Sequence, residues 1–294
     1  MNNSSHYVNC TLSNIHYVSH TYHHSHPHMI HKHPDELELL YITNGTGQYL
    51  VNGRRYVLKA GNLIICRPGV LHGESMQFKN VMESYCIALK NIYINGFPDN
   101  FLKESTLNPI LNFSESIIKE TYENLIFTLN TIYHETLGST YTCNTIASAI
   151  FSYVMDLLSI RHKSDDIINE SPDDFVYKVI RYLDEHFKEK ISLEKIAKNF
   201  HISQSYLSHI FKSETGMSVL KYAMQLKIGE AQSLLIKSDY PIGDISYQLN
   251  FNDNSHFNIM FKKYTGLSPS QYRSYFHEFD KKHIYFDDSL KQFL

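Results

Sequence analysis

The chain has 294 residues, of which 43% are hydrophobic and 19% are charged, and its formal net charge is −3. This length predicts two domains, or three if the repeat units are counted singly, and the composition is that of an ordinary soluble protein. The longest apolar runs are too short to cross a bilayer, and the N-terminus lacks a secretion-signal pattern. Four scattered cysteines without a CxxC pair favour reduced thiols, so we expect a cytoplasmic protein with no membrane partner.

Residues 1 to about 95 carry the signals of short β-strands. Tyr49–Val51 and Tyr56–Leu58 flank the turn Asn52-Gly53-Arg54, an arrangement typical of a β-hairpin. Glycine and proline residues divide the rest of this region into short segments, at Gly45, Gly47, Gly61, Pro68 and Gly69. Short, regularly spaced strands predict a small β-barrel or jelly roll.

Four polar residues of this region stand at a characteristic spacing. The pattern His31-x-His33-x4-Glu38-x6-Gly45, followed by Gly61, Pro68 and His72, resembles the two motifs of the cupin fold. Residues two apart on a strand point the same way, so His31 and His33 can face the interior together. Three imidazoles and one carboxylate can hold Zn²⁺, Mn²⁺ or Fe²⁺, or can contact an organic ligand directly.

A histidine-rich segment precedes these four residues, with His20, His23, His24, His26 and His28. Such a tract can bind metal, but a solvated strand and loop is the interpretation that we favour.

From about Ser114 the apolar residues follow a helical period. They predict two long helices, at about 114–136 and 145–162. The apolar positions are Ile118, Tyr122, Leu125, Leu129, Ile132, Ile146, Ile150, Tyr153, Val154, Leu157 and Leu158. The acidic, proline-containing stretch Lys163–Asp174 then predicts a linker between domains. We therefore expect an N-terminal domain over residues 1–165, a linker over 166–175 and a helical domain over 176–282.

The helical domain contains an internal repeat, because Ser205–Tyr222 reappears fifty residues later as Ser255–Tyr272. Seven positions match: Ser205/Ser255, Phe211/Phe261, Lys212/Lys262, Thr215/Thr265, Gly216/Gly266, Ser218/Ser268 and Tyr222/Tyr272. Each copy also places apolar residues at i, i+3 and i+4. The repeat predicts two helix-turn-helix units, with second helices at Ser203–Thr215 and Asp253–Tyr264, joined by a long helix at about 218–236.

The outer faces of the two second helices carry the candidate DNA contacts. These residues are Gln204, Ser205, Ser208, His209 and Lys212 in the first copy, and Asn254, Ser255, Asn258, Ile259 and Lys262 in the second. Glutamine and asparagine can pair with adenine, Ile259 suits a thymine methyl group, and the lysines suit phosphates. A helical bundle with merely solvated faces is the alternative, but it does not explain why the polar face occurs twice.

Residues 192–273 closely resemble the DNA-binding domain of the AraC/XylS family of bacterial transcription regulators. The resemblance is carried by Ile196-Ala197, Ser205-Tyr206-Leu207, Phe211-Lys212, Gly216, Tyr222, Ala231, Leu234-Leu235, Ile245, Phe251, Phe257, Phe261-Lys262-Lys263-Tyr264, Gly266, Ser268-Pro269 and Tyr272-Arg273. Lys227, Ser246 and Asn250 depart from it, since the family usually has Arg, Ala and Gly there. The departures put the geometry of the second turn in doubt.

The resemblance implies a regulator of transcription that binds double-stranded promoter DNA and is not an enzyme. It also implies a cupin domain that senses a small molecule, such as a sugar or related metabolite, and helices after the barrel that often form a homodimer. Because sugar-sensing members bind ligand directly through similar residues, it favours a metal-free pocket and no cofactor, with a divalent metal as the open alternative.

The sequence thus predicts an α+β fold. It consists of an N-terminal cupin or jelly-roll β-barrel with two or more packing helices, and an all-α domain of two helix-turn-helix subdomains joined by a long helix. The predicted ligand residues are His31, His33, Glu38 and His72. The competing function is a metal-dependent cupin enzyme with an appended helical domain.

Overall fold

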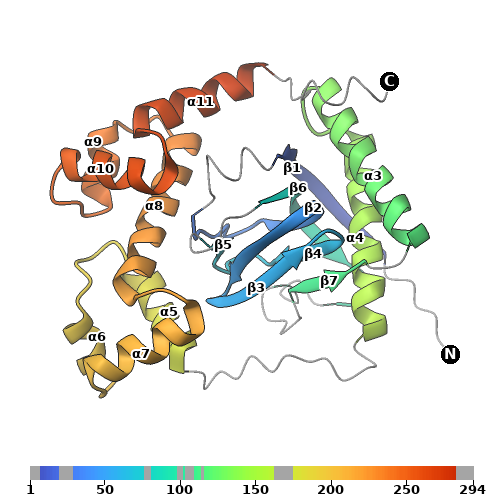
Figure 1. The fold of residues 1–294 in the computed structure, drawn as a ribbon. Helices are drawn as coiled ribbons and strands as arrows, with labels where there is room; N and C mark the ends of the chain where they lie inside the picture. The colour runs from blue at the N-terminus through green and yellow to red at the C-terminus, as the bar shows by residue number, and fades with distance from the viewer. Residues whose placement is uncertain are drawn as a thin grey trace.

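The computed structural model describes residues 7–19, 29–75, 81–97, 102, 109–113, 116–161 and 175–282. A β-sheet lies in the middle of the molecule, with two long helices on one side and a helical domain on the other (Figure 1). This arrangement confirms the α+β prediction. The histidine-rich segment and nearly all of the predicted linker lie outside the described residues, so the predicted domain limits stay predictions.

Among the residues that the structure describes, the β-sheet has seven strands joined by antiparallel pairs. They are β1 (Val8–Val18), β2 (Leu37–Val51), β3 (Arg54–Lys59), β4 (Asn62–Cys66), β5 (His72–Glu74), β6 (Val81–Ile94) and β7 (Ile110–Asn112). The pairing order is β1-β6-β2-β4-β7, and β3 and β5 also pair with β2. Among the described strands this path does not close on itself, so we call this part the β-domain.

The predicted hairpin between β2 and β3 is confirmed. Val51 pairs with Arg54, so the turn consists of Asn52 and Gly53 alone and Arg54 belongs to the strand. Both turn residues have positive φ angles, 51° for Asn52 and 80° for Gly53. Asparagine and glycine adopt this backbone most easily, which explains why the sequence signal was reliable here.

Helices α3 (Ser116–Glu135) and α4 (Tyr141–Arg161) follow the sheet, as predicted. α4 packs on β1 and α3 packs beside α4. Tyr122, Ile126 and Leu129 form the buried stripe of α3. Leu125, which the helical period placed in that stripe, is 37% exposed. That assignment was wrong by one residue, because Ile126 continues the i, i+4, i+7 spacing from Tyr122.

The helical domain comprises seven helices among the described residues. They are α5 (Phe175–His186), α6 (Leu193–Asn199), α7 (Gln204–Thr215), α8 (Val219–Lys237), α9 (Ile242–Gln248), α10 (Asn254–Thr265) and α11 (Pro269–Lys282). Ser203 and Asp253 cap the N-termini of α7 and α10, each accepting a hydrogen bond from the amide three residues later. Gly216 and Gly266 end the same helices in the left-handed conformation. Each side-chain cap stabilises its helix by about 1 kcal/mol.

The matched positions of the repeat are mostly structural. The buried hydroxyl of Thr215 donates to the Phe211 carbonyl and accepts from the Met217 amide, and Thr265 makes the equivalent bonds in the second copy. The ring of Tyr222 packs edge-on against that of Phe211, with 5.4 Å between the ring centres. Tyr272 packs in the same way against Phe261, with 5.3 Å between the ring centres. The repeat therefore preserves how each unit folds more than what it contacts.

Helix α8 belongs to both units. Tyr222, Ala223 and Leu226 lie in the core of the first unit, which we call core 1. Ile228, Ala231 and Leu235 lie in the core of the second, core 2. α8 has 19 residues, which gives it a length of about 28 Å. None of the described helices combines the length and apolarity needed to span a bilayer.

Candidate functional site

The predicted DNA contacts lie on the open faces of α7 and α10. Every one of them is exposed except Ser208, which is half-buried: Gln204, Ser205, His209 and Lys212 on α7, and Asn254, Ser255, Asn258, Ile259 and Lys262 on α10. The opposite faces hold Leu207, Phe211, Phe257 and Phe261, each fully buried. Ile259 is 66% exposed, which is unusual for an apolar side chain on a solvated face. Both second helices therefore present a continuous surface to a partner.

The turn before each of these helices contains one residue in the left-handed region. These residues are His201, with φ of 56°, and Asn250, with φ of 52°. Asn250 is one of the departures from the family pattern, and asparagine adopts this backbone more easily than most residues. Its carbonyl accepts a hydrogen bond of 3.2 Å from Lys227, whose ammonium lies 5.5 Å from the centre of the Phe251 ring. Burial lowers the pKa of Lys227. Two of the departures thus support each other.

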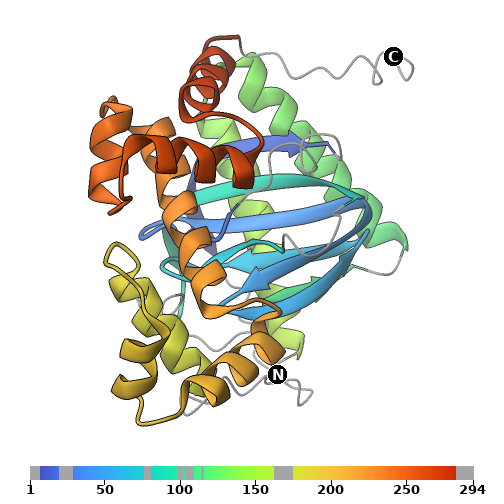
Figure 2. The ribbon, with the colours of Figure 1, turned by 60° about the vertical axis from the view of Figure 1, so that its left-hand side comes forward.

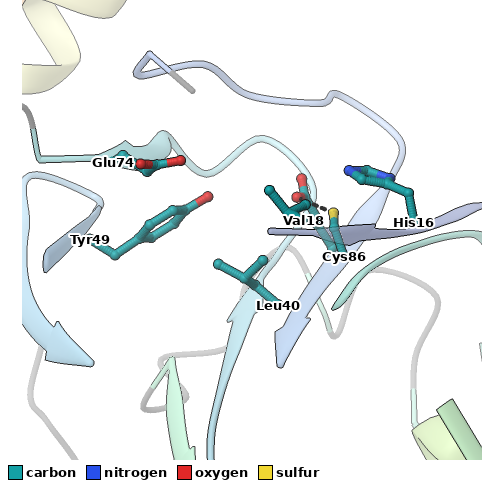
Figure 3. Close-up of a pocket in the computed structure, with 7 residues that line it drawn as sticks. His16, Val18, Leu40, Tyr49, Glu74 and Cys86 are labelled. Carbon is teal, nitrogen blue, oxygen red and sulfur yellow. Dashed lines mark hydrogen bonds between the residues drawn. The ribbon is translucent and has the colours of Figure 1, made fainter. Parts of the chain in front are cut away.

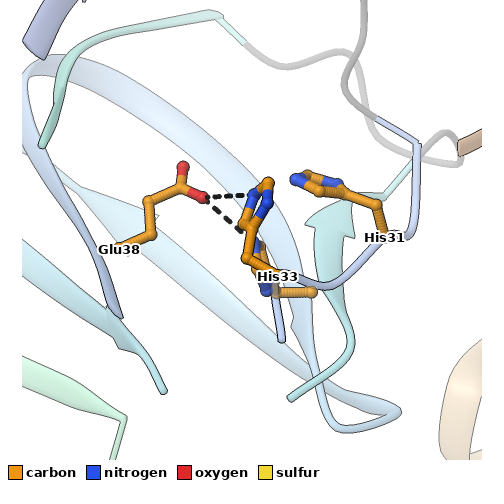
Figure 4. A group of neighbouring side chains, drawn as sticks. His31, His33 and Glu38 are labelled. Carbon is orange, nitrogen blue, oxygen red and sulfur yellow. Dashed lines mark hydrogen bonds and ion pairs between the residues drawn. The ribbon is translucent and has the colours of Figure 1, made fainter. Parts of the chain in front are cut away.

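The second candidate site is a cluster in the β-domain that we call the pocket cluster: His31, His33, Glu38 and His72. One ligand atom from each of these residues lies within 4.8 Å of all the others. Glu38 comes from β2 and His72 from β5, while His31 and His33 come from the segment that leads into β2. Figure 4 shows the rings of His31 and His33 and the Glu38 carboxylate gathered together. The cupin spacing thus brings together all four residues that it singled out.

Each histidine ring of the cluster has one nitrogen held from outside the cluster. Nδ1 of His31 lies 2.7 Å from the Met29 carbonyl, and Nδ1 of His72 lies 2.8 Å from the Val70 carbonyl. A carbonyl only accepts, so these Nδ1 atoms carry the proton. Nδ1 of His33 lies 3.3 Å from the Glu36 carboxylate. Histidines that bind metals are oriented in this way, and Nε2 would then be the ring nitrogen that meets the ion.

The Glu38 carboxylate faces two of the histidines in the cluster. Its Oε2 atom is 3.3 Å from Nε2 of His33 and 3.1 Å from Nε2 of His72. Burial alone would raise the pKa of Glu38, but the hydrogen bonds with His33 and His72 hold it well below its ordinary value. A carboxylate facing ring nitrogens at this distance needs positive charge, from protons on the rings or from a bound cation. The residues therefore fit a divalent metal.

On its other side, Glu38 faces a small pocket that the sequence did not predict. The Cys86 thiol donates a hydrogen bond of 2.6 Å to Oε1 of Glu38. Burial raises the pKa of Cys86, and the neighbouring carboxylate raises it further, so the sulfur stays protonated. The pocket is lined by His16, Val18, Glu38, Leu40, Tyr49, Glu74 and Cys86 (Figure 3). These residues come from four strands, β1, β2, β5 and β6. They form no sequence motif from which the pocket could have been predicted.

Known families match both parts of the chain. A helix-turn-helix domain family matches residues 196–275, and a cupin domain family matches residues 20–87. The chain is 26% identical to the uncharacterized HTH-type transcriptional regulator YdiP of Escherichia coli K12, over 84% of this chain and 81% of YdiP. It is also 26% identical to the HTH-type transcriptional activator RhaR of Salmonella dublin, over 80% of this chain and 84% of RhaR.

Among solved structures, the chain resembles the C-terminal domain of AraT, a response regulator from Geobacillus stearothermophilus. The identity is 31%, the match covers 34% of this chain and 84% of that domain, and the TM-score is 0.33.

Proposed function

Because this chain is a DNA-binding transcription regulator of the AraC/XylS family with an N-terminal cupin domain, we propose that a small effector bound at the pocket cluster controls its activity at promoters. The relatives are regulators, so the chain is not an enzyme. The observation that carries the proposal is the convergence of His31, His33, Glu38 and His72 within 4.8 Å. Such a concentration of polar groups, with Glu38 and His72 buried and His31 and His33 half-buried, is typical of a ligand site.

A divalent transition metal is part of the proposed occupant. Three imidazoles and one carboxylate suit Zn²⁺, Mn²⁺ or Fe²⁺. When bound, the ion would supply the positive charge that the Glu38 carboxylate needs. The chain's own residues orient the donors, through the Met29 carbonyl, the Glu36 carboxylate and the Val70 carbonyl.

The proposed effector class is the one that the family resemblance implies, a sugar or a related metabolite. The small pocket beside the cluster offers polar groups to it, from Glu74, Tyr49 and His16, and Glu38 is shared with the pocket cluster. Such groups can hydrogen-bond with hydroxyl groups of an effector. The metal and the metabolite would then act at adjacent positions in one domain.

Promoter DNA is read by α7 and α10 in this proposal. Two second helices joined by α8 can enter successive major grooves, which lie about 34 Å apart on one face of DNA. The polar set on α7 differs from that on α10, so one chain would read an asymmetric site. A homodimer, acting in the cytoplasm where the promoter is, would cover two such sites.

The proposal is tested with untagged full-length protein. Elemental analysis of the purified chain should find close to one equivalent of a transition metal, and less than about 0.2 equivalents after loading would reject the metal. DNA binding is measured on a duplex selected by the full chain from a random-sequence library. Glu38→Ala should abolish the change in DNA affinity on adding metal, and a normal response in this variant would place the effector site elsewhere.

A further inference from the structure

Three consecutive residues, Met29, Ile30 and His31, connect the pocket cluster with both helix-turn-helix units. Met29 is fully buried in core 2, the core of the second unit. Ile30 is buried in core 1, the core of the first unit. His31 belongs to the pocket cluster, and its backbone exchanges two hydrogen bonds of 2.9 Å with His72. Neighbouring residues of one short segment therefore contact the ligand site and each DNA-reading unit.

Helix α8 provides the surface on which this segment lies. A Cβ added at Gly229 would be 2.2 Å from the Ile30 carbonyl oxygen and 3.4 Å from Cβ of His31. Gln232 accepts a hydrogen bond of 3.3 Å from the Met29 amide. Only a residue without a side chain permits this approach. α8 lies beside β5 on the side of the sheet opposite α3 and α4 in Figures 1 and 2.

The same face of α8 carries a buried amide. Gln225, Gly229 and Gln232 are spaced i, i+4 and i+7, so they share one side of the helix. Gln225 is fully buried, yet neither polar atom of its side chain has a hydrogen-bond partner among the described residues. An unpaired buried amide costs free energy, so Gln225 destabilises the packing of α8.

A second contact runs from the pocket cluster to the end of α8. Oε2 of Glu36 lies 3.3 Å from Nδ1 of His33 and 3.7 Å from Nζ of Lys237. Farther out, Arg55 of β3 donates hydrogen bonds to the carbonyls of Ser213 and Glu214 at the C-terminus of α7. The β-domain thus contacts the DNA-binding domain at one recognition helix and along the helix that joins both units.

We infer that the segment Met29–His31, docked on the Gln225–Gly229–Gln232 face of α8, transmits occupancy of the pocket cluster to both helix-turn-helix units. This inference rests on the proposed function, since it takes the cluster to be a ligand site. An ion or effector that fixes the His31 ring fixes the backbone that lies against Gly229. Because α8 is shared, a change in its docking moves α7 and α10 together.

The docking step is tested without any ligand, by hydrogen–deuterium exchange on the full chain. Gly229→Ala adds a methyl group where the Ile30 carbonyl lies, and should speed amide exchange around Met29–His31 and along the turns of α8 that face the β-domain. Gly243→Ala is the matched control, because this glycine also lies in a helix and its added Cβ would meet only the Asn254 side chain at 3.2 Å. Equal exchange in the two variants would overturn the docking.

The coupling step is tested with Co²⁺ alone, whose absorption reports binding. Coupling between sites is reciprocal, so Gly229→Ala should change the Co²⁺ dissociation constant by about fivefold or more, although Gly229 is no metal ligand. Co²⁺ should in turn slow exchange in α8 of the wild type and not in the variant. Identical Co²⁺ affinity in both proteins would overturn the coupling and leave the pocket intact. If neither protein bound Co²⁺, the proposed metal would be wrong and the coupling would be overturned with it, while the exchange comparison still decides the docking.

Discussion

Glu38 is the residue on which the account of the pocket depends most. Its carboxylate meets His33 and His72 on one side and the Cys86 thiol on the other. The four cluster residues could be predicted because the cupin spacing links them along the chain. Cys86 could not, since a cysteine inside a strand gives no sign of which side chain it faces. Glu36 was missed as well, because beside Asp35 it resembles an ordinary surface acid.

Replacing Glu38 with Gln keeps the shape of the side chain and removes its charge. We expect Zn²⁺ affinity to fall by more than about a hundredfold, since loss of even an outer-shell partner costs tenfold to a hundredfold. Titration calorimetry on the full chain measures this. Glu120→Gln, at an exposed position of α3, is the control and should bind as the wild type does. Equal affinities in all three proteins would mean that the cluster does not hold the ion.

Base reading is tested at His209 and Asn258. Each alanine variant should lose about 1–3 kcal/mol of DNA-binding free energy. It should also relax the sequence preference at a single base pair, because each side chain contacts only nearby bases. The Asn258 amide donates a hydrogen bond of 2.8 Å to the Asn254 carbonyl, so it must turn to reach a base. Binding measured against all single substitutions of a selected duplex gives the answer. A uniform loss over all duplexes would assign these residues to the DNA backbone instead.

Lys262 should behave differently, because a lysine at this position suits a phosphate. Lys262→Ala is expected to weaken binding to all duplexes alike. It should also reduce the slope of log affinity against log salt concentration by about one. Lys190→Ala, at an exposed position outside the two recognition helices, should leave the slope unchanged. A loss confined to one base pair would contradict the phosphate assignment.

Among the secondary-structure elements, the helices of the DNA-binding domain were the most predictable. Their caps are local signals, and Ser203 and Gly216 mark α7 within one residue of its expected limits. The docking of Met29 on α8 was beyond sequence reasoning, since its partner Gln232 lies 203 positions away. The helical period also assigned Leu125 wrongly to the buried stripe of α3. Apolar residues occur at two adjacent positions there, Leu125 and Ile126, and either could continue the stripe.

The N-terminal caps of α7 and α10 should each contribute measurably to stability. Ser203→Ala and Asp253→Ala remove the side-chain oxygens that accept from the Tyr206 and His256 amides. Each is expected to lower the free energy of unfolding by about 1 kcal/mol. Urea unfolding followed by circular dichroism measures the change. Ser213→Ala, at an exposed position within α7, is the control, and a cap variant as stable as this control would contradict the assignment.

For the molecule as a whole, we propose that a second copy binds to α3, the turn after it and the start of α4. Leu125 is 37% exposed, Phe127 48%, Leu137 65% and Tyr141 87%. Exposed apolar side chains on these helices suit the interface of a two-fold dimer. Phe127→Lys should shift sedimentation of the full chain from dimer toward monomer, whereas Tyr93→Lys, on β6 and 51% exposed, should not. Monomeric wild-type protein at micromolar concentration would contradict the homodimer.

Whether occupancy of the pocket cluster sets the DNA affinity of the chain is measured by fluorescence anisotropy. The full chain is titrated onto its selected duplex after chelation and again with saturating Zn²⁺, in the wild type and in Glu38→Gln. We predict that Zn²⁺ changes the dissociation constant of the wild type by at least about fivefold, the lower range of allosteric couplings, and leaves the variant unchanged. Wild-type protein that binds Zn²⁺ and yet holds the duplex with the same affinity in both conditions would contradict it.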